Sequence, residues 1–161
     1  MCASILGFHA PLLRAIADQL GLKPIIELAR MPGVQGVYRI TVNYFDGRVC
    51  NSVATLCSTQ TGGIVQETVY QRALSRKPIA HQIDEMRYEE FIQAVKSLSF
   101  DRMLDQPNLP AYNSTDLWLF ERAAGTFSHS VILAPELAQD QHARLVNAVR
   151  NGLPEALRQV K

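Results

Sequence analysis

The spacing of hydrophobic residues changes along this chain, and the change limits the folds that the chain can adopt. Residues 11–20 carry one apolar stripe at helical spacing, with Pro11 suited to the first helical position and Gly21 to the helix end. Pro24 predicts a second short helix that stops at the breaker over 31–33. Residues 38–44 then alternate between apolar and polar, which is typical of a strand with one buried face.

Three further segments in the first half have the composition of strands or turns. Asp46-Gly47 accepts positive φ, so it predicts a tight hairpin turn and a returning strand over residues 48–57. Residues 64–73 are rich in Val, Thr and Tyr, which favours a third strand. Residues 79–83, which follow a proline, are either a short edge strand or a loop.

The second half is predicted to contain two helices and a hairpin. Asp84 suits the N-cap of a helix whose apolar residues lie on one face. That face consists of Tyr88, Phe91, Ile92, Val95 and Leu98. Residues 117–122 and 127–133 form a hairpin around a small-residue turn, and a last helix carries one stripe from His142 to Leu153.

These elements together predict an α+β fold. The order is helix, three strands, helix, two strands, helix (α-βββ-α-ββ-α), and the short strand connections indicate a mainly antiparallel sheet of about five strands. Each helix has a single apolar stripe, so we expect helices on one face of the sheet, as a two-layer sandwich. We expect one domain over residues 1–161, with a helical N-terminal segment (1–33) and an α+β core (34–161).

Charge and cysteine content narrow the function classes. The chain has 16 basic and 15 acidic residues, a net charge of +1, which argues against a nucleic-acid-binding protein. No stretch is long and apolar enough for membrane insertion, and no Lys or Arg precedes Arg14 as a signal peptide would need. The three cysteines show no disulfide framework, so we expect free thiols and a cytoplasmic location.

The sequence shows no catalytic or metal-binding motif. The four histidines lack the spacing of metal ligands, so neither a metal nor a cofactor is expected. Ser128-His129-Ser130 resembles a nucleophile beside a base, but on a strand both serines face one way and the histidine the other. Cys50 has no same-face cation nearby except Arg48. Whether the chain is an enzyme stays open, and the balance of these observations is against it.

The leading functional prediction is a non-catalytic partner-binding module, such as an accessory subunit, an assembly factor or a chaperone-like protein. The strand around Trp118 is apolar on both faces, so it is either central beneath helices or exposed to a partner. The partner is another protein or a second copy of this chain. The predicted partner-binding residues are Met103, Leu109, Tyr112, Leu117, Trp118 and Phe120.

Two alternatives remain. One is a small-molecule-binding or enzymatic α+β domain with a pocket between sheet and helices. Its predicted polar contributors are Cys50, Glu67, Tyr70 and His81. The element order is similar to that of small secretion chaperones, which are acidic, unlike this chain. The run from Gly62-Gly63 through Phe91 and Phe100 to the hairpin at Asp116 resembles small β-rich metallopeptidase inhibitors of the emfourin type. That resemblance implies the second alternative, a protein inhibitor of a peptidase.

Overall fold

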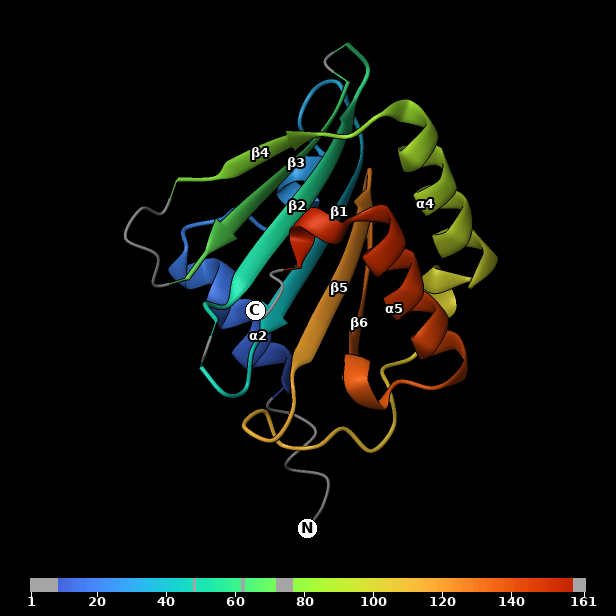
Figure 1. Ribbon diagram of the computed structural model, residues 1–161. Coiled ribbons are helices and arrows are strands. Elements are labelled where there is room, and N and C mark those ends of the chain that lie inside the picture. Colours follow the sequence, from blue (N-terminus) through green and yellow to red (C-terminus); the bar gives the residue numbers. More distant parts are fainter. Residues whose placement is uncertain (1–8, 48, 62, 72–76, 158–161) are drawn as a thin grey trace.

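The computed structural model describes residues 9–47, 49–61, 63–71 and 77–157. They form a six-stranded antiparallel sheet in the order β4-β3-β2-β1-β5-β6 (Figure 1). The strands are β1 (Val34–Asn43), β2 (Ser52–Thr59), β3 (Gly63–Tyr70), β4 (Ile79–Gln82), β5 (Leu117–Ala124) and β6 (Phe127–Leu133). The helices are α2 (His9–Gln19), α3 (Ile25–Ala29), α4 (Glu85–Ser97) and α5 (Asp140–Gly152), with 3-10 turns at Phe100–Arg102, Pro135–Leu137 and Pro154–Ala156.

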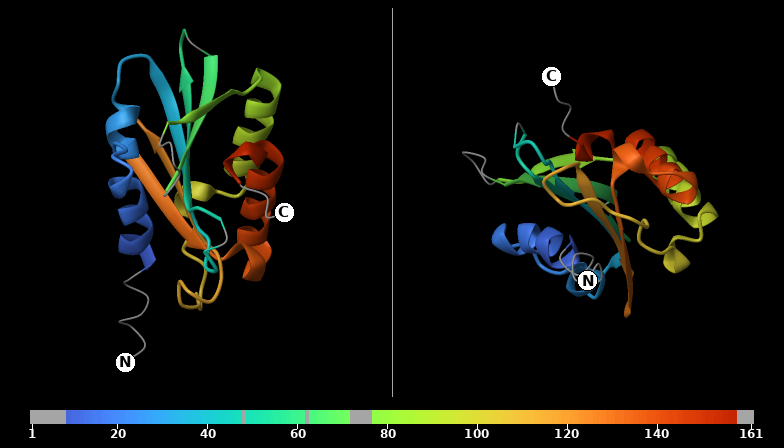
Figure 2. Two further views of the ribbon diagram at one scale, coloured as in Figure 1. Left: turned by 60° about the vertical axis from the view of Figure 1, so that its left-hand side comes forward. Right: turned by 90° about the horizontal axis from the view of Figure 1, so that it is seen from below.

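The structure confirms the α+β class and the antiparallel sheet, and it adds a second helical layer. Figure 2 shows α2 and α3 on one side of the sheet and α4 and α5 on the other. The sheet is therefore covered on both faces, where the sequence predicted one. The extra strand is β4, for which the sequence allowed either a short edge strand or a loop. It pairs with β3 from Val65↔Gln82 to Thr68↔Ile79.

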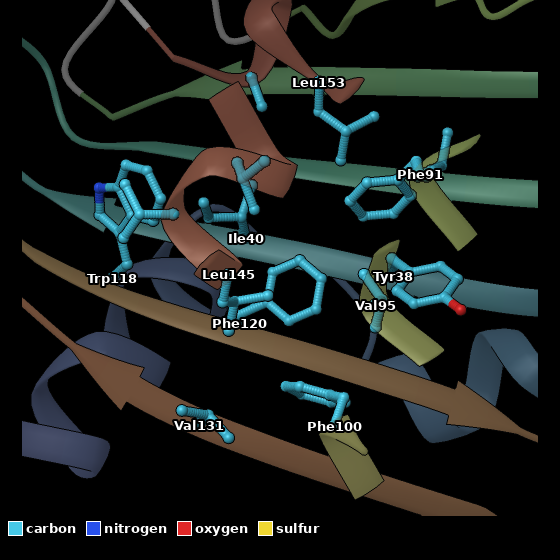
Figure 3. Close-up of a cluster of buried hydrophobic side chains, with 14 of the residues drawn as sticks. Tyr38, Ile40, Phe91, Val95, Phe100, Trp118, Phe120, Val131, Leu145 and Leu153 are labelled. Atoms are coloured by element: carbon cyan, nitrogen blue, oxygen red, sulfur yellow. The ribbon is translucent and has the colours of Figure 1, made fainter. Parts of the chain in front are cut away.

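The larger core lies between the sheet and helices α4 and α5. Tyr38 of β1, and Trp118 and Phe120 of β5, point into this layer (Figure 3). Phe91 of α4 meets Tyr38 edge to face with ring centroids 5.3 Å apart, and Phe100 meets Phe120 at 5.1 Å. Such aromatic pairs add specific geometry to the burial of apolar area, so they fix how α4 lies on β1 and β5.

The smaller core lies under α2 and α3. Leu13 and Ile16 of α2 belong to one buried cluster with Leu119 of β5. Ile25 of α3 packs in a second cluster that includes Val37 of β1. A strand with apolar side chains on both faces, such as β5, has to be buried on both, and the two helical layers satisfy that need.

The element boundaries follow local signals, with one exception. Asp84 caps α4 as predicted, since its Oδ1 accepts the Arg87 N–H at 2.8 Å. Gly47 adopts the positive φ of +70° expected for a turn, but β2 begins only at Ser52, so the β1–β2 connection is longer than a tight hairpin. Asn51 Oδ1 accepts the Tyr44 N–H at 2.8 Å, and this side-chain bond takes the place of the next backbone rung.

The outer edge of β6 is covered by the segment that follows α4. Asp105 Oδ1 accepts the Ile132 N–H at 2.8 Å, and the Gln106 N–H donates to the Ile132 carbonyl at 2.9 Å. Gln106 Oε1 then accepts the Ala134 N–H at 2.9 Å. An exposed strand edge is a template for pairing with other chains, and these bonds cover the C-terminal end of this one. Among the described residues, no helix has the length and apolar character needed to cross a membrane.

Candidate functional site

A row of polar side chains crosses the sheet beneath α2 and α3. The strand register makes Arg39 of β1 the neighbour of Thr55 of β2 on one side and of Glu121 of β5 on the other. The row continues to Glu67 of β3 and to Ser130 of β6. Helices normally cover apolar sheet faces. A polar row beneath α2 and α3 is therefore unusual, because apolar side chains are expected at these positions.

Arg39 is held at the centre of this row. Its side chain is buried, with the residue 4% exposed. Nε donates to Thr55 Oγ1 at 3.0 Å and Nη1 donates to the Lys23 carbonyl at 2.8 Å, which fastens the link between α2 and α3 to the sheet. Burial lowers the pKa of Arg39, but a guanidinium stays charged at any working pH. Within the described residues Nη2 of Arg39 has no hydrogen-bond acceptor, so this end of the guanidinium is available to donate.

Glu121 lies next to Arg39 but does not pair with it directly. Its side chain is 12% exposed, and its ion-pair contact within the described residues is Oε1 to Arg14 Nε at 3.9 Å. No hydrogen bond to its carboxylate is present there. Burial raises the pKa of Glu121, while the charges of Arg39 and then Arg14 act in the opposite direction. With one long ion-pair contact and no hydrogen bond from the described residues, this partly buried carboxylate has unused acceptor capacity.

A hollow of about 420 Å³ opens in front of these two groups. Its floor is the sheet, with Arg39, Thr41, Leu119 and Glu121. Its roof comes from the end of α2 and from the link and start of α3, with Ala17, Leu22, Pro24, Ile25 and Ile26. At the rim, Arg14 donates from Nη2 to Ser130 Oγ at 3.2 Å, and Asp18 and Ser128 lie nearby. We call this space the α2–sheet hollow.

A second hollow of about 440 Å³ lies on the other side of Arg39. It is lined by Thr55, Cys57 and Glu67 from the sheet and by Leu28 and Met31 from the helical side, among others. Burial raises the pKa of the Cys57 thiol more than the charge of Arg39 lowers it, so the thiol is protonated at neutral pH. No local pattern predicts that Cys57 and Arg39 are close, because the two residues lie on different strands.

Most of the predicted partner-binding residues lie in the core. Leu117, Trp118 and Phe120 are buried on the two faces of β5, and Met103 and Leu109 are buried as well. Tyr112 is the exposed member of the six, at 52%. The two apolar faces of the Trp118 strand are thus explained by helices on both sides of the sheet, and five of these side chains are not available at the surface.

The four polar residues predicted for a pocket are not brought together. Glu67 lines the second hollow, whereas Cys50 lies with Tyr112 around a separate hollow of about 280 Å³ at the end of the sheet. His81 lies on β4 and pairs in register with Gln66, so it is on the sheet face opposite to that of Glu67. Tyr70 ends β3. Cys50 and Cys57 are free thiols, as predicted.

The structure confirms the predicted orientation of the Ser128-His129-Ser130 segment. The two serines border the α2–sheet hollow. The His129 ring lies on the other face, where Nε2 is 2.8 Å from the Met103 carbonyl and the ring meets Phe100 edge to face. No hydrogen bond between His129 and either serine is present in the described part of the chain, so the three residues do not form a nucleophile and base pair.

Sequence reasoning missed the residues that define the α2–sheet hollow, namely Arg14, Arg39 and Glu121. The alternating pattern of residues 38–44 indicates that Arg39 lies on the polar face of a strand, and Glu121 falls near the end of the predicted strand over residues 117–122. The available signal was β5 itself, since its two apolar faces require cover on both sides of the sheet. That requirement places the polar face of β1, which pairs with β5, under a helix.

Among the described residues, no group of three or more His, Cys, Asp or Glu side chains is arranged to hold a metal ion. The sequence was also compared with known proteins. It matches no protein-family model, and the search of curated proteins gives no match.

Proposed function

We propose that this chain is a small-molecule-binding domain whose site is the α2–sheet hollow. The observation that carries the proposal is the arrangement of Arg39 and Glu121. Arg39 is buried and Glu121 is partly buried, the two are neighbours on adjacent strands, and yet they make no direct ion pair in the described structure. The proposal concerns binding and includes no chemical step.

Energetics favour a ligand over a purely structural role for this pair. Taking a carboxylate and a guanidinium out of water costs several kcal/mol per ion, and close contact with full hydrogen bonding is needed to offset that cost. Arg39 has an unused donor and Glu121 has unused acceptor capacity. A bound molecule that supplies both partners would satisfy the two groups at once.

The shape of the hollow also fits a small ligand. Its volume of about 420 Å³ is within the usual range for small-molecule sites, roughly 300–1,000 Å³. Aliphatic side chains from the roof and Leu119 from the floor form most of the apolar wall, and polar groups lie on the floor and at the rim. This combination gives a ligand both apolar contact and a fixed orientation.

A thermal-shift experiment on the full chain tests the proposal. The panel contains small metabolites of four classes: anions, cations, zwitterions and neutral compounds. A ligand at one hundred times its Kd stabilises the folded state by about 2.7 kcal/mol, which is readily detected. Ser128→Trp is expected to abolish the shift, because the new ring fills the mouth of the hollow.

The matched control is Phe127→Trp. Phe127 precedes Ser128 on β6 and, because side chains alternate, it points to the opposite face. This variant is expected to keep the ligand-induced shift. Absence of stabilisation by every class, or equal shifts in both tryptophan variants, contradicts a site in this hollow.

A second candidate function, partner binding, is favoured by one observation. Tyr112 and Phe45 are both exposed and line the same hollow at the end of the sheet. If the partner is a second copy, the native chain sediments as a dimer and Phe45→Ser with Tyr112→Ser sediments as a monomer. A monomeric native chain removes a second copy as the partner.

The peptidase-inhibitor alternative stays a prediction. The free thiols of Cys50 and Cys57 favour the predicted cytoplasmic location.

A further inference from the structure

We propose that the ligand of the α2–sheet hollow is a free amino acid with an aliphatic side chain, bound as a zwitterion between Glu121 and Arg39. This inference rests on the proposed binding function and names its ligand class.

The charges around the hollow balance in pairs. Arg39 and Glu121 lie inside, and Arg14 and Asp18 lie at the rim. A ligand with one net negative charge would be repelled by the partly buried Glu121, and one with a net positive charge by the buried Arg39. A ligand of zero net charge that carries both signs suits this interior, because each of its charged groups meets an opposite one.

The two anchors start from neighbouring positions on the sheet, so one small molecule can reach both. Arg39 and Glu121 are direct partners across β1 and β5, and such partners have Cβ atoms about 4.5–5.5 Å apart. An α-amino acid carries its ammonium and carboxylate on the same carbon, which matches adjacent anchors. The ammonium has three donors for the Glu121 oxygens, and the carboxylate accepts from Nη2 of Arg39 and from the hydroxyl of Ser128 or Ser130.

The remaining wall selects the side chain. Leu22, Ile25 and Ile26 form the roof opposite the sheet. Leu119 belongs to the floor beside Glu121. These are aliphatic groups, so they favour an aliphatic side chain over a charged or strongly polar one. A branched residue such as leucine supplies apolar area that glycine lacks.

Isothermal titration of the full chain with four matched probes tests the ligand class. L-leucine is the complete probe. 4-Methylpentanoate lacks the ammonium, 3-methylbutylamine lacks the carboxylate, and glycine lacks the side chain. We expect L-leucine to bind tightest, and each truncated probe to bind at least about tenfold more weakly, because it leaves a buried charge unpaired or apolar surface uncovered.

Two glutamine variants separate the role of Glu121 from general effects on the fold. Glu121→Gln is expected to weaken L-leucine binding at least about tenfold and to leave 4-methylpentanoate binding unchanged or tighter, because the variant removes a negative charge. Glu67→Gln is the matched control, since Glu67 lies in the same polar row on the far side of Arg39 and outside this hollow. It is expected to bind all four probes like the native chain, and circular dichroism verifies that both variants are folded.

The possible failures are distinguishable from failure of the proposed function. If 4-methylpentanoate binds as tightly as L-leucine, the zwitterion inference is overturned, and a small-molecule site remains. The zwitterion inference is also overturned, and a small-molecule site remains, if none of the four probes binds but another compound of the panel gives a thermal shift that Ser128→Trp removes. If neither the probes nor the panel bind, both the inference and the proposed function are wrong.

Discussion

Gly152 lies where helices α5 and α4 approach each other, and the structure leaves no room there for a side chain. A Cβ atom at this position would lie 2.8 Å from Cδ2 and 3.0 Å from Cβ of Phe91. Phe91 is itself packed against Tyr38 in the larger core, so it has little freedom to move away. The close approach of the two helices therefore depends on this glycine.

Gly152→Ala is expected to destabilise the chain by about 1–3 kcal/mol, because the added methyl group forces Phe91 or the helix out of place. Chemical denaturation followed by circular dichroism measures the change. Gly36→Ala is the control, since a Cβ there meets no atom within 4 Å. A Gly152→Ala variant as stable as Gly36→Ala contradicts the packing of α5 on α4.

The same helix end is held by an ion pair whose strength depends on pH. Arg87 of α4 donates from Nε to the Gly152 carbonyl at 2.7 Å and from Nη1 to Glu155 Oε1 at 2.9 Å. This pairing lowers the pKa of Glu155 below its usual value. The stabilisation is therefore present above the unfolded pKa, about 4.3, and is lost as pH falls through the lower folded pKa.

Glu155→Gln is expected to cost about 0.5–1 kcal/mol at pH 7, since the pair is only partly exposed. The difference between the native chain and the variant should vanish at strongly acidic pH. Urea denaturation at a series of pH values from 7 to 2 measures it. A difference that is independent of pH would show that the variant acts through packing and not through charge.

The pH dependence of stability that Glu121 contributes has the opposite sign. Burial raises its pKa in the folded state, so its contribution to stability is complete below about pH 4 and is lost as pH rises through the folded pKa. Relative to the native chain, the ligand-free Glu121→Gln variant should thus become progressively more stable from pH 4 to pH 7. The same pH series measures this trend. A native chain that gains on the variant over this range would mean that Glu121 is already satisfied by protein groups.

At the scale of single elements, the covered edge of β6 is open to direct measurement. Asp105→Ala removes the acceptor of the buried Ile132 N–H and is expected to cost about 1–3 kcal/mol. Native-state hydrogen exchange should show faster exchange of the Ile132 amide. Asp105→Asn keeps an acceptor oxygen and should retain most of the protection. Unchanged exchange in the alanine variant would exclude Asp105 as the cover of this edge.

Elements with a local signal were predictable, and those set by distant contacts were not. The Asp84 cap and the hairpin at Gly125 depend on neighbouring residues, and both appear as expected. The length of the β1–β2 connection depends on the Asn51 side chain, and the strand identity of residues 79–82 depends on pairing with β3. The site was hidden for the same reason, since Arg39 becomes buried only when α2 and α3 cover its face.

At the scale of the whole molecule, the two helical layers share the central strands, so we expect them to unfold together. Leu13 of α2 is fully buried in the smaller core. Trp118 of β5 is buried in the larger core, on the other face of the sheet. Leu13→Ala should cost about 2–5 kcal/mol through the cavity that it leaves. Leu12→Ala, at a half-buried position of the same helix, should cost less.

Trp118 fluorescence and far-ultraviolet circular dichroism should give the same denaturation midpoint for Leu13→Ala. Coincident midpoints mean that residues 1–33 and 34–161 behave as one cooperative unit. If fluorescence at Trp118 is unaffected while part of the helical signal is lost early, the N-terminal helices form a separate unit.

The fastening of the α2–α3 link affects how a guest could lie on this face of the sheet. Arg39 lines both hollows, of about 420 and 440 Å³, and its Nη1 donates to the Lys23 carbonyl. A guest that passes between Arg39 and the link, from one hollow into the other, has to break that hydrogen bond. Lengthening a guest in this direction should accordingly cost affinity that lengthening it toward the mouth does not.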